Sequence, residues 1–188
     1  MDNSHKIGLL SGFKILTRGG VNESDAAYAR LNDGVDLLGN VIPKDAGAPS
    51  QIGGKAVKFN ADFKPEEDLG QAEVVAKVGR STGYTEGLIS AFGLDLIQVQ
   101  VHGVGIVYFN NVIEVRWKSI EEPFTRPGDS GSLVLTKQGL EGIGIHFASG
   151  KNGVDEDGNI FRTSYACSLH AIMAGDEDGL KLFWMDES

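Results

Sequence analysis

The chain of 188 residues contains the stretch Phe124-Thr-Arg-Pro-Gly-Asp-Ser-Gly-Ser-Leu-Val-Leu135, which says most about its fold. The first half, up to Gly131, consists mostly of residues that favour turns, and an apolar run typical of a β-strand follows Ser132. Glycine at position 128 permits a backbone turn that other residues avoid. The stretch is therefore either an ordinary surface turn or a loop that presents Ser130 at the beginning of a strand.

The regions around this stretch favour short strands separated by turns. Residues 95–101 alternate with the period of two that a β-strand requires. The 26 glycines fall largely between short apolar runs. Further strands are expected at residues 7–16, 26–31, 73–78, 87–92, 106–109, 112–117, 132–136, 142–147 and 160–167. Only residues 169–174, behind Ser168, favour a helix, so the sequence predicts an all-β antiparallel sandwich or barrel.

The chain is expected to consist of two β parts joined by a long connection. Residues 43–69 are rich in Gly, Pro, Lys and acidic residues, and Val57 and Phe59 form their only apolar alternation. We therefore expect an incomplete first β part at residues 1–42, a linker at 43–69, and a second β part at 70–188 that carries the Ser130 loop.

The charge disfavours two classes of partner. Seventeen Lys and Arg against 26 Asp and Glu leave a net charge of −9, and no basic block offsets it. Such a surface repels phosphate backbones and anionic lipid heads. We expect no nucleic-acid partner and no membrane partner.

The sequence contains no pattern of residues that indicates a metal-ion or cofactor site. Cys167 is the only cysteine, and the four histidines are scattered, so no pair has the spacing of a zinc site. The acidic run at residues 155–159 lacks the pattern of a calcium-binding EF-hand and is expected to be a solvated loop. A single cysteine forms no internal disulfide, and the first residues do not resemble a secretory signal. The expectation is a cytoplasmic protein without cofactor or metal.

Four stretches together carry a family resemblance. They are Ile7-Gly-Leu-Leu with Asp25-Ala-Ala, Lys77-Val-Gly-Arg-Ser-Thr-Gly, Pro127-Gly-Asp-Ser-Gly-Ser-Leu-Val and Gly144-Ile-His-Phe-Ala. The chain resembles the trypsin-like serine proteases, in particular the intracellular branch that includes bacterial proteins and the plant narrow-leaf protein. The Gly-x-Ser-x-Gly turn of α/β-hydrolases does not fit, because Ser132 stands in its last position. The resemblance implies a chymotrypsin-like fold with a complete second barrel and an incomplete first one.

The resemblance also implies roles for individual residues. Ser130 would be the nucleophile of a serine endopeptidase and Asp25 the aspartate that orients its base. The N–H groups of Gly128 and Ser130 would stabilise the oxyanion of a tetrahedral intermediate, while Asp129 would support the loop by a buried charge contact.

The substrate groove is expected beside the nucleophile loop. The resemblance places Phe124 at the base of the primary pocket, and Ile145 and His146 on the strand that flanks the groove. A phenyl ring offers no carboxylate to a basic side chain, so small or apolar side chains of a protein or peptide substrate are favoured over Lys and Arg.

The general base has no clear counterpart in the sequence. In chain order the family has His, Asp and Ser, but only His5 precedes Asp25, and its surroundings do not resemble the family's histidine loop. Three accounts remain open: a chain that is part of a longer protease, an inactive relative that binds a peptide or protein without cutting it, or rescue by another histidine such as His146. An incomplete first barrel would leave strand edges exposed around residues 7–16 and 26–31, so a homodimer through these edges is expected.

Overall fold

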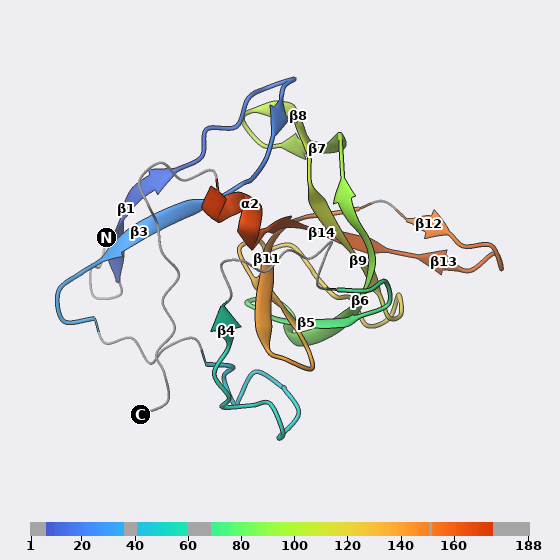
Figure 1. Cartoon of the computed structure of the whole chain (residues 1–188), viewed down its shortest axis with the longest axis horizontal. Coiled ribbons are helices and arrows are strands. Elements are labelled where there is room, and N and C mark those ends of the chain that lie inside the picture. The colour runs from blue at the N-terminus through green and yellow to red at the C-terminus, as the bar shows by residue number, and fades with distance from the viewer. Residues whose placement is uncertain (1–6, 36–40, 60–68, 151, 175–188) are drawn as a thin grey trace.

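The computed structural model describes residues 7–35, 41–59, 69–150 and 152–174. Figure 1 shows a barrel of strands, with a long hairpin on one side of it and a shorter hairpin on the opposite side. His5 lies outside the described residues, and so do positions 60–68 of the expected linker.

A closed antiparallel barrel of six strands forms the centre of the fold. The order is β10-β5-β6-β9-β14-β11, and the pairing of β10 with β11 closes the ring. The barrel strands are β5 (Val74–Gly79), β6 (Gly83–Leu94), β9 (Val112–Trp117), β10 (Leu133–Thr136), β11 (Glu141–Ser149) and β14 (Thr163–Ser168). The short strand β4 (Lys58–Phe59) adds to the edge of β11 in parallel. Each of the six strands therefore has a neighbour on both sides.

Alternating side chains explain why these segments form barrel strands. In β9, Val115 and Trp117 are buried, while Glu114 and Arg116 are partly exposed. The register between β6 and β9 shifts at two points, which lets the long strand β6 bend around the barrel.

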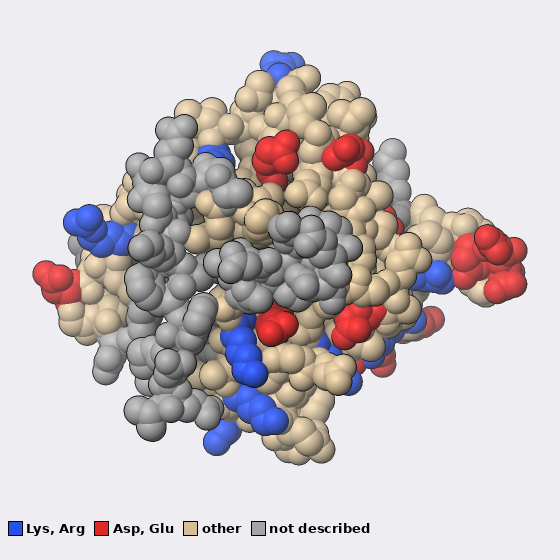
Figure 2. Space-filling view, in the orientation of Figure 1, with Lys and Arg blue, Asp and Glu red and all other residues tan. Residues whose placement is uncertain are grey.

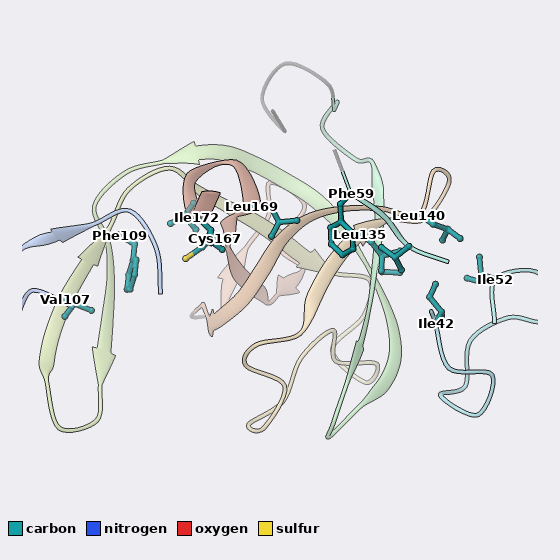
Figure 3. Close-up of a cluster of buried hydrophobic side chains, with 13 residues drawn as sticks. Ile42, Ile52, Phe59, Val107, Phe109, Leu135, Leu140, Cys167, Leu169 and Ile172 are labelled. Carbon is teal, nitrogen blue, oxygen red and sulfur yellow. The ribbon is translucent and has the colours of Figure 1, made fainter. Parts of the chain in front are cut away.

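Two clusters of buried side chains form the core. The smaller one fills the barrel around Val75, Ile113, Phe124, Val134 and Ile143. Figure 3 shows the larger cluster as a row that begins at Val107 and Phe109 and ends at Leu135, Ile42 and Ile52. The row passes Cys167 and Leu169. The larger cluster thus joins the barrel to the segments before it in the chain.

The remaining strands lie outside the barrel. The two-stranded hairpin consists of β1 (Gly8–Phe13) and β3 (Ala27–Leu31), and a three-stranded sheet consists of β2 (Val21–Asn22), β8 (Gly105–Phe109) and β7 (Ile97–Val101). A small hairpin consists of β12 (Gly153–Val154) and β13 (Ile160–Phe161), and Figure 2 shows acidic residues gathered at its tip. The short helix α2 (Leu169–Ala174) follows β14.

The predicted all-β fold class is confirmed, with differences of detail. The strand expected at residues 160–167 is two strands, because the chain changes pairing partner at Arg162. The expected linker at 43–69 contributes β4 and three buried side chains, those of Ile52, Val57 and Phe59. The division of the chain at residues 42 and 69 stays a prediction. No helix among the described residues is long and apolar enough to cross a membrane.

Candidate functional site

The loop before β10 places Ser130 at the surface. Gly128 has a φ of +100° and Gly131 a φ of +89°, so two left-handed residues flank the Asp-Ser pair. A Cβ at position 128 would also lie 2.5 Å from Oγ of Ser81. Ser130 itself is exposed, and its hydroxyl lies 3.5 Å from the carbonyl oxygen of Phe147 on β11. The two glycines therefore allow a tight loop conformation in which Ser130 faces solvent beside β11.

The backbone N–H groups of the loop divide into two sets. Those of Asp129, Gly131 and Ser132 donate to carbonyl oxygens at 3.0, 2.8 and 3.0 Å. The N–H groups of Gly128 and Ser130 donate to no atom of the described residues. The loop is thus held by its bonded N–H groups, and the two N–H groups that remain are available to an external acceptor.

Asp129 anchors the loop inside the barrel. Its carboxylate is fully buried and accepts hydrogen bonds from the N–H groups of Ser81 at 2.7 Å, Thr82 at 3.3 Å and Arg126 at 2.9 Å. The Thr82 hydroxyl donates a further bond at 2.8 Å. Burial alone would raise the pKa of Asp129, but these hydrogen bonds and the charge of Lys77 lower it to about 2. Asp129 is therefore ionised at neutral pH.

Lys77 on β5 is a residue of the site that the local sequence pattern does not predict. Its ammonium group is fully buried, lies 3.4 Å from Oδ2 of Asp129 and donates to the Thr82 hydroxyl at 2.6 Å. A Cβ at Gly79 would approach the Asp129 carboxylate to 2.4 Å, so glycine leaves the space for this pair. The signal in the sequence is one lysine within the apolar strand at residues 74–79.

The two candidate groove residues on β11 differ in exposure. His146 is 3% exposed, and its Nδ1 lies 3.1 Å from the carbonyl oxygen of Tyr165. Burial lowers the pKa of His146, which favours the neutral ring. Ile145 is half-buried and packs against the larger core cluster. Strand β11 contacts the Ser130 loop through backbone atoms, because the His146 carbonyl oxygen accepts a hydrogen bond from the Gly131 N–H group. A groove role for both residues stays a prediction.

Asp25 lies between β2 and β3, against the end of β14. Its backbone N–H group donates to Sγ of Cys167 at 3.4 Å, and although the residue is exposed, partial desolvation raises the pKa of its carboxyl group. Burial also raises the pKa of the Cys167 thiol to about 12, so the sulfur is protonated at neutral pH. Cys167 on β14 pairs with Ile145 on β11. Ile145 stands two residues before Phe147, whose carbonyl oxygen lies beside the Ser130 hydroxyl. The fold thus ties Asp25 and Ser130 to neighbouring positions of one strand pair.

No histidine of the described part of the chain is hydrogen-bonded to the Ser130 hydroxyl. His102 is exposed in the turn between β7 and β8, and His170 is part of α2. The ring of His146 faces the Tyr165 carbonyl instead. The described residues therefore present the serine on its loop and hold Asp25 against Cys167 of the neighbouring strand pair, but they place no histidine in hydrogen-bond contact with the serine.

The Phe124 ring belongs to the barrel core. It is 0% exposed and packs in the smaller cluster, and its carbonyl oxygen accepts from the Thr85 hydroxyl at 2.7 Å. Its predicted place at the base of a pocket stays a prediction. Among the described residues no three His, Cys, Asp or Glu side chains lie close enough together to hold a metal ion.

Solved structures similar to this one are serine proteases. A chymotrypsin of Cellulomonas bogoriensis matches with a TM-score of 0.63 and 20% identity, over 97% of this chain and 78% of the protease. A glutamic acid-specific serine protease matches with a TM-score of 0.56 and 18% identity, over 89% of this chain and 70% of that one. A Nocardiopsis protease matches with a TM-score of 0.53 and 17% identity, over 81% of this chain and 65% of that protease. These likenesses confirm the chymotrypsin-like fold and, at such identities, the fold alone.

Sequence comparison identifies the family. No curated protein matches the chain. The family model of the Nal1 C-terminal domain matches residues 15–153, a stretch that includes Asp25, Lys77 and the whole Ser130 loop. This match and the shared fold confirm the resemblance to the narrow-leaf protein and the trypsin-like proteases. The chain belongs to the family of the Nal1 C-terminal domain.

Proposed function

We propose that the chain carries the nucleophile half of a serine endopeptidase that works through an acyl-enzyme. The observation that carries this proposal is the pair of N–H groups of Gly128 and Ser130, which donate to no described residue and belong to the loop of an exposed serine. Donors fixed in advance toward a developing negative charge are commonly the largest contribution to acyl transfer. The buried Lys77–Asp129 pair supports the proposal, because it holds the loop without using either of these N–H groups.

In the proposed reaction the Ser130 oxygen attacks the carbonyl carbon of a peptide bond. The hydroxyl proton passes to a general base, and the carbonyl oxygen becomes an oxyanion that accepts from the Gly128 and Ser130 N–H groups. The tetrahedral intermediate collapses, the base returns the proton to the amine that leaves, and an ester to Ser130 remains. Water then attacks this ester with the help of the same base and releases the second product.

The base in this proposal is a histidine outside the described residues, and Asp25 is the carboxylate that orients it. The position of Asp25 against Cys167, at the strand pair that also contacts Ser130, supports this role. An ionised carboxylate beside an imidazole stabilises the imidazolium that forms during attack.

A second candidate function is a peptide- or protein-binding module without catalysis. The observation that favours it is the contact of the Ser130 hydroxyl with the Phe147 carbonyl in place of a base. Without a base a serine hydroxyl is a weak nucleophile, although the surface around it can still bind an extended peptide.

Labelling with a fluorophosphonate probe tests the proposal. We expect the purified chain to be labelled slowly, because the N–H groups of Gly128 and Ser130 stabilise the attack even where no histidine contacts the serine, and the Ser130→Ala variant to lose the label completely. Ser11→Ala, which removes an exposed hydroxyl from the β1–β3 hairpin, is the matched control and should be labelled like the parent. A folded chain that is not labelled overturns the endopeptidase proposal for these 188 residues. If such a chain still binds peptides, the binding module is the better account.

A further inference from the structure

A cavity opens beside the nucleophile loop. Its volume is about 300 Å³, within the lower range of pockets that take small ligands. Its lining includes Trp117, Thr125, Arg126, Pro127, Ser149 and Arg162. Pro127 is three residues before Ser130, and Ser149 is two residues after Phe147, whose carbonyl lies beside the Ser130 hydroxyl. The cavity therefore lies between the two backbone segments that flank the candidate nucleophile.

Hydroxyl groups line one wall of this cavity. The Thr125 hydroxyl lies 3.1 Å from the Ser149 hydroxyl and 2.7 Å from the hydroxyl of Ser164. Trp117 donates from Nε1 to the Ser164 oxygen at 2.8 Å. Thr125 and Ser164 are fully buried, so this chain of hydroxyls is fixed by the barrel, and Ser149 is its exposed end. An apolar ligand in this cavity would offer no hydrogen-bond partner to the hydroxyl groups of the wall, and burying those groups without a partner costs free energy.

Two arginines complete the lining. The guanidinium of Arg162 lies over the Trp117 ring, 5.5 Å from its centroid, and its Nε donates to the Asn152 side chain at 2.6 Å. The other two nitrogens of that guanidinium, and the whole side chain of Arg126, have no hydrogen bond or ion pair to a described residue. Arg116, by contrast, is paired with Asp155 at 2.8 Å. None of the described lining residues carries a carboxylate.

We propose that this cavity binds the carboxylate side chain of a glutamate or aspartate in a peptide, at the residue before the bond that Ser130 attacks. This inference rests on the proposed function and names the substrate class of the same site. A guanidinium with two free nitrogens forms charge-assisted, bidentate hydrogen bonds to a carboxylate, and the Ser149 hydroxyl is a further donor. A lysine or arginine side chain would meet like charge instead. The expectation of small or apolar side chains depended on Phe124, whose ring is fully buried.

Calorimetric binding of short peptide amides tests this specificity without requiring catalysis. The protein is the full chain with Ser130→Ala, and the probes are N-acetyl-Ala-Ala-X amides with X as Glu, Gln, Leu or Lys. We expect the Glu peptide to bind about tenfold more tightly than the Gln peptide, the difference that one charge-assisted contact commonly supplies. The preference should weaken as salt is raised, because the arginines are at the surface.

Two arginine variants distinguish the effect of the cavity on peptide binding from the effect of the protein's overall charge. Arg162→Gln should remove most of the preference for Glu and leave the affinity for the Gln peptide unchanged. Arg30→Gln removes the same charge from the exposed β3 strand and should leave the preference intact. Equal binding of the Glu and Gln peptides, no binding of any peptide to the folded chain at millimolar concentration, or a full preference in Arg162→Gln would each overturn the inference.

The failure of this inference is distinguishable from the failure of the proposed function. The binding measurement involves neither the Ser130 hydroxyl nor a base. If fluorophosphonates do not label the chain but the Glu peptide binds more tightly than the Gln peptide, the missing label overturns the endopeptidase proposal. The binding preference then still supports the carboxylate pocket. Ser130-dependent labelling with equal binding of Glu and Gln peptides overturns the pocket alone.

Discussion

The barrel and the β1–β3 hairpin of this chain bury their apolar side chains to very different degrees. Phe124 in the barrel is 0% exposed, whereas Phe13 on β1 is 64% exposed, and Leu10 in the same strand is 66% exposed. The barrel closes on itself, but the hairpin has two strands, and no other described strand pairs with either of their outer edges. The Ser130 loop is attached to the closed part, and Asp25 lies in the connection between the two strands of the open part. The fold thus holds the nucleophile loop more firmly than the carboxylate proposed to orient its base.

The largest effect is expected from removing the same side chain in the two regions. Phe124→Ala should lower the free energy of unfolding by about 3–5 kcal/mol, because it leaves a cavity in a closely packed core. Phe13→Ala should change it by less than about 0.5 kcal/mol, because most of the ring already contacts water. Equilibrium unfolding in urea, followed by far-ultraviolet circular dichroism, measures both values.

Similar losses in the two variants would contradict this contrast between the regions. A large loss in Phe13→Ala alone would mean that the hairpin is covered by a partner, such as a second copy of the chain. The measurement should therefore be repeated at two protein concentrations.

The next effect concerns the charge that the barrel buries. The folded pKa of Asp129 is about 2, below its ordinary value of 3.8, so the stabilisation from its ionised form is present above about pH 4. It is lost as the pH falls from 4 toward 2, and it amounts to roughly 2–3 kcal/mol, because the pKa is lowered by nearly two units and each unit corresponds to about 1.4 kcal/mol. Asp129→Asn should lack this contribution, so its difference in stability from the parent should shrink by that amount between pH 5 and pH 2.

Glu86 provides the control for this pH dependence. Burial alone would raise its pKa, but hydrogen bonds from Lys118, Lys137 and Tyr84 lower it to about 2, so it titrates in the same range. Glu86→Gln should therefore retain the Asp129 contribution and lose its own. A constant difference between Asp129→Asn and the parent across this pH range would show that Asp129 keeps its charge for another reason or is not buried in solution.

The sequence predicted those parts of the fold that depend on local pattern. Strands with a period of two, the Ser130 loop and the helix at residues 169–174 follow from neighbouring side chains, and the structure has them at or near the expected residues. The break at Arg162 does not follow from the local pattern. It arises because β13 pairs with the nearby strand β12, whereas β14 pairs with β9 and β11, which are more distant in sequence.

The candidate site was predicted in part for the same reason. The residue types and spacing in the Ser130 loop indicate a loop that presents a serine. Lys77 was missed because a lysine in a strand ordinarily reaches solvent, and only the tertiary structure brings it against Asp129. The arginine-lined cavity was missed as well, since Arg126 and Arg162 come from separate loops and share a wall only once the barrel has closed.

The smallest effect is expected at the exposed face of the hairpin, where we propose that two chains associate. Ile7, Leu10, Phe13 and Ile15 are each more than 60% exposed, and paired copies would cover the free strand edges. Sedimentation velocity should show a dimer whose fraction rises with concentration, and Leu10→Ser should weaken it about fivefold, which corresponds to about 1 kcal/mol. Leu96→Ser is the matched control, because Leu96 is 62% exposed in the turn between β6 and β7. A monomer at every concentration contradicts the proposal, and equal weakening by both variants would place the interface away from the hairpin.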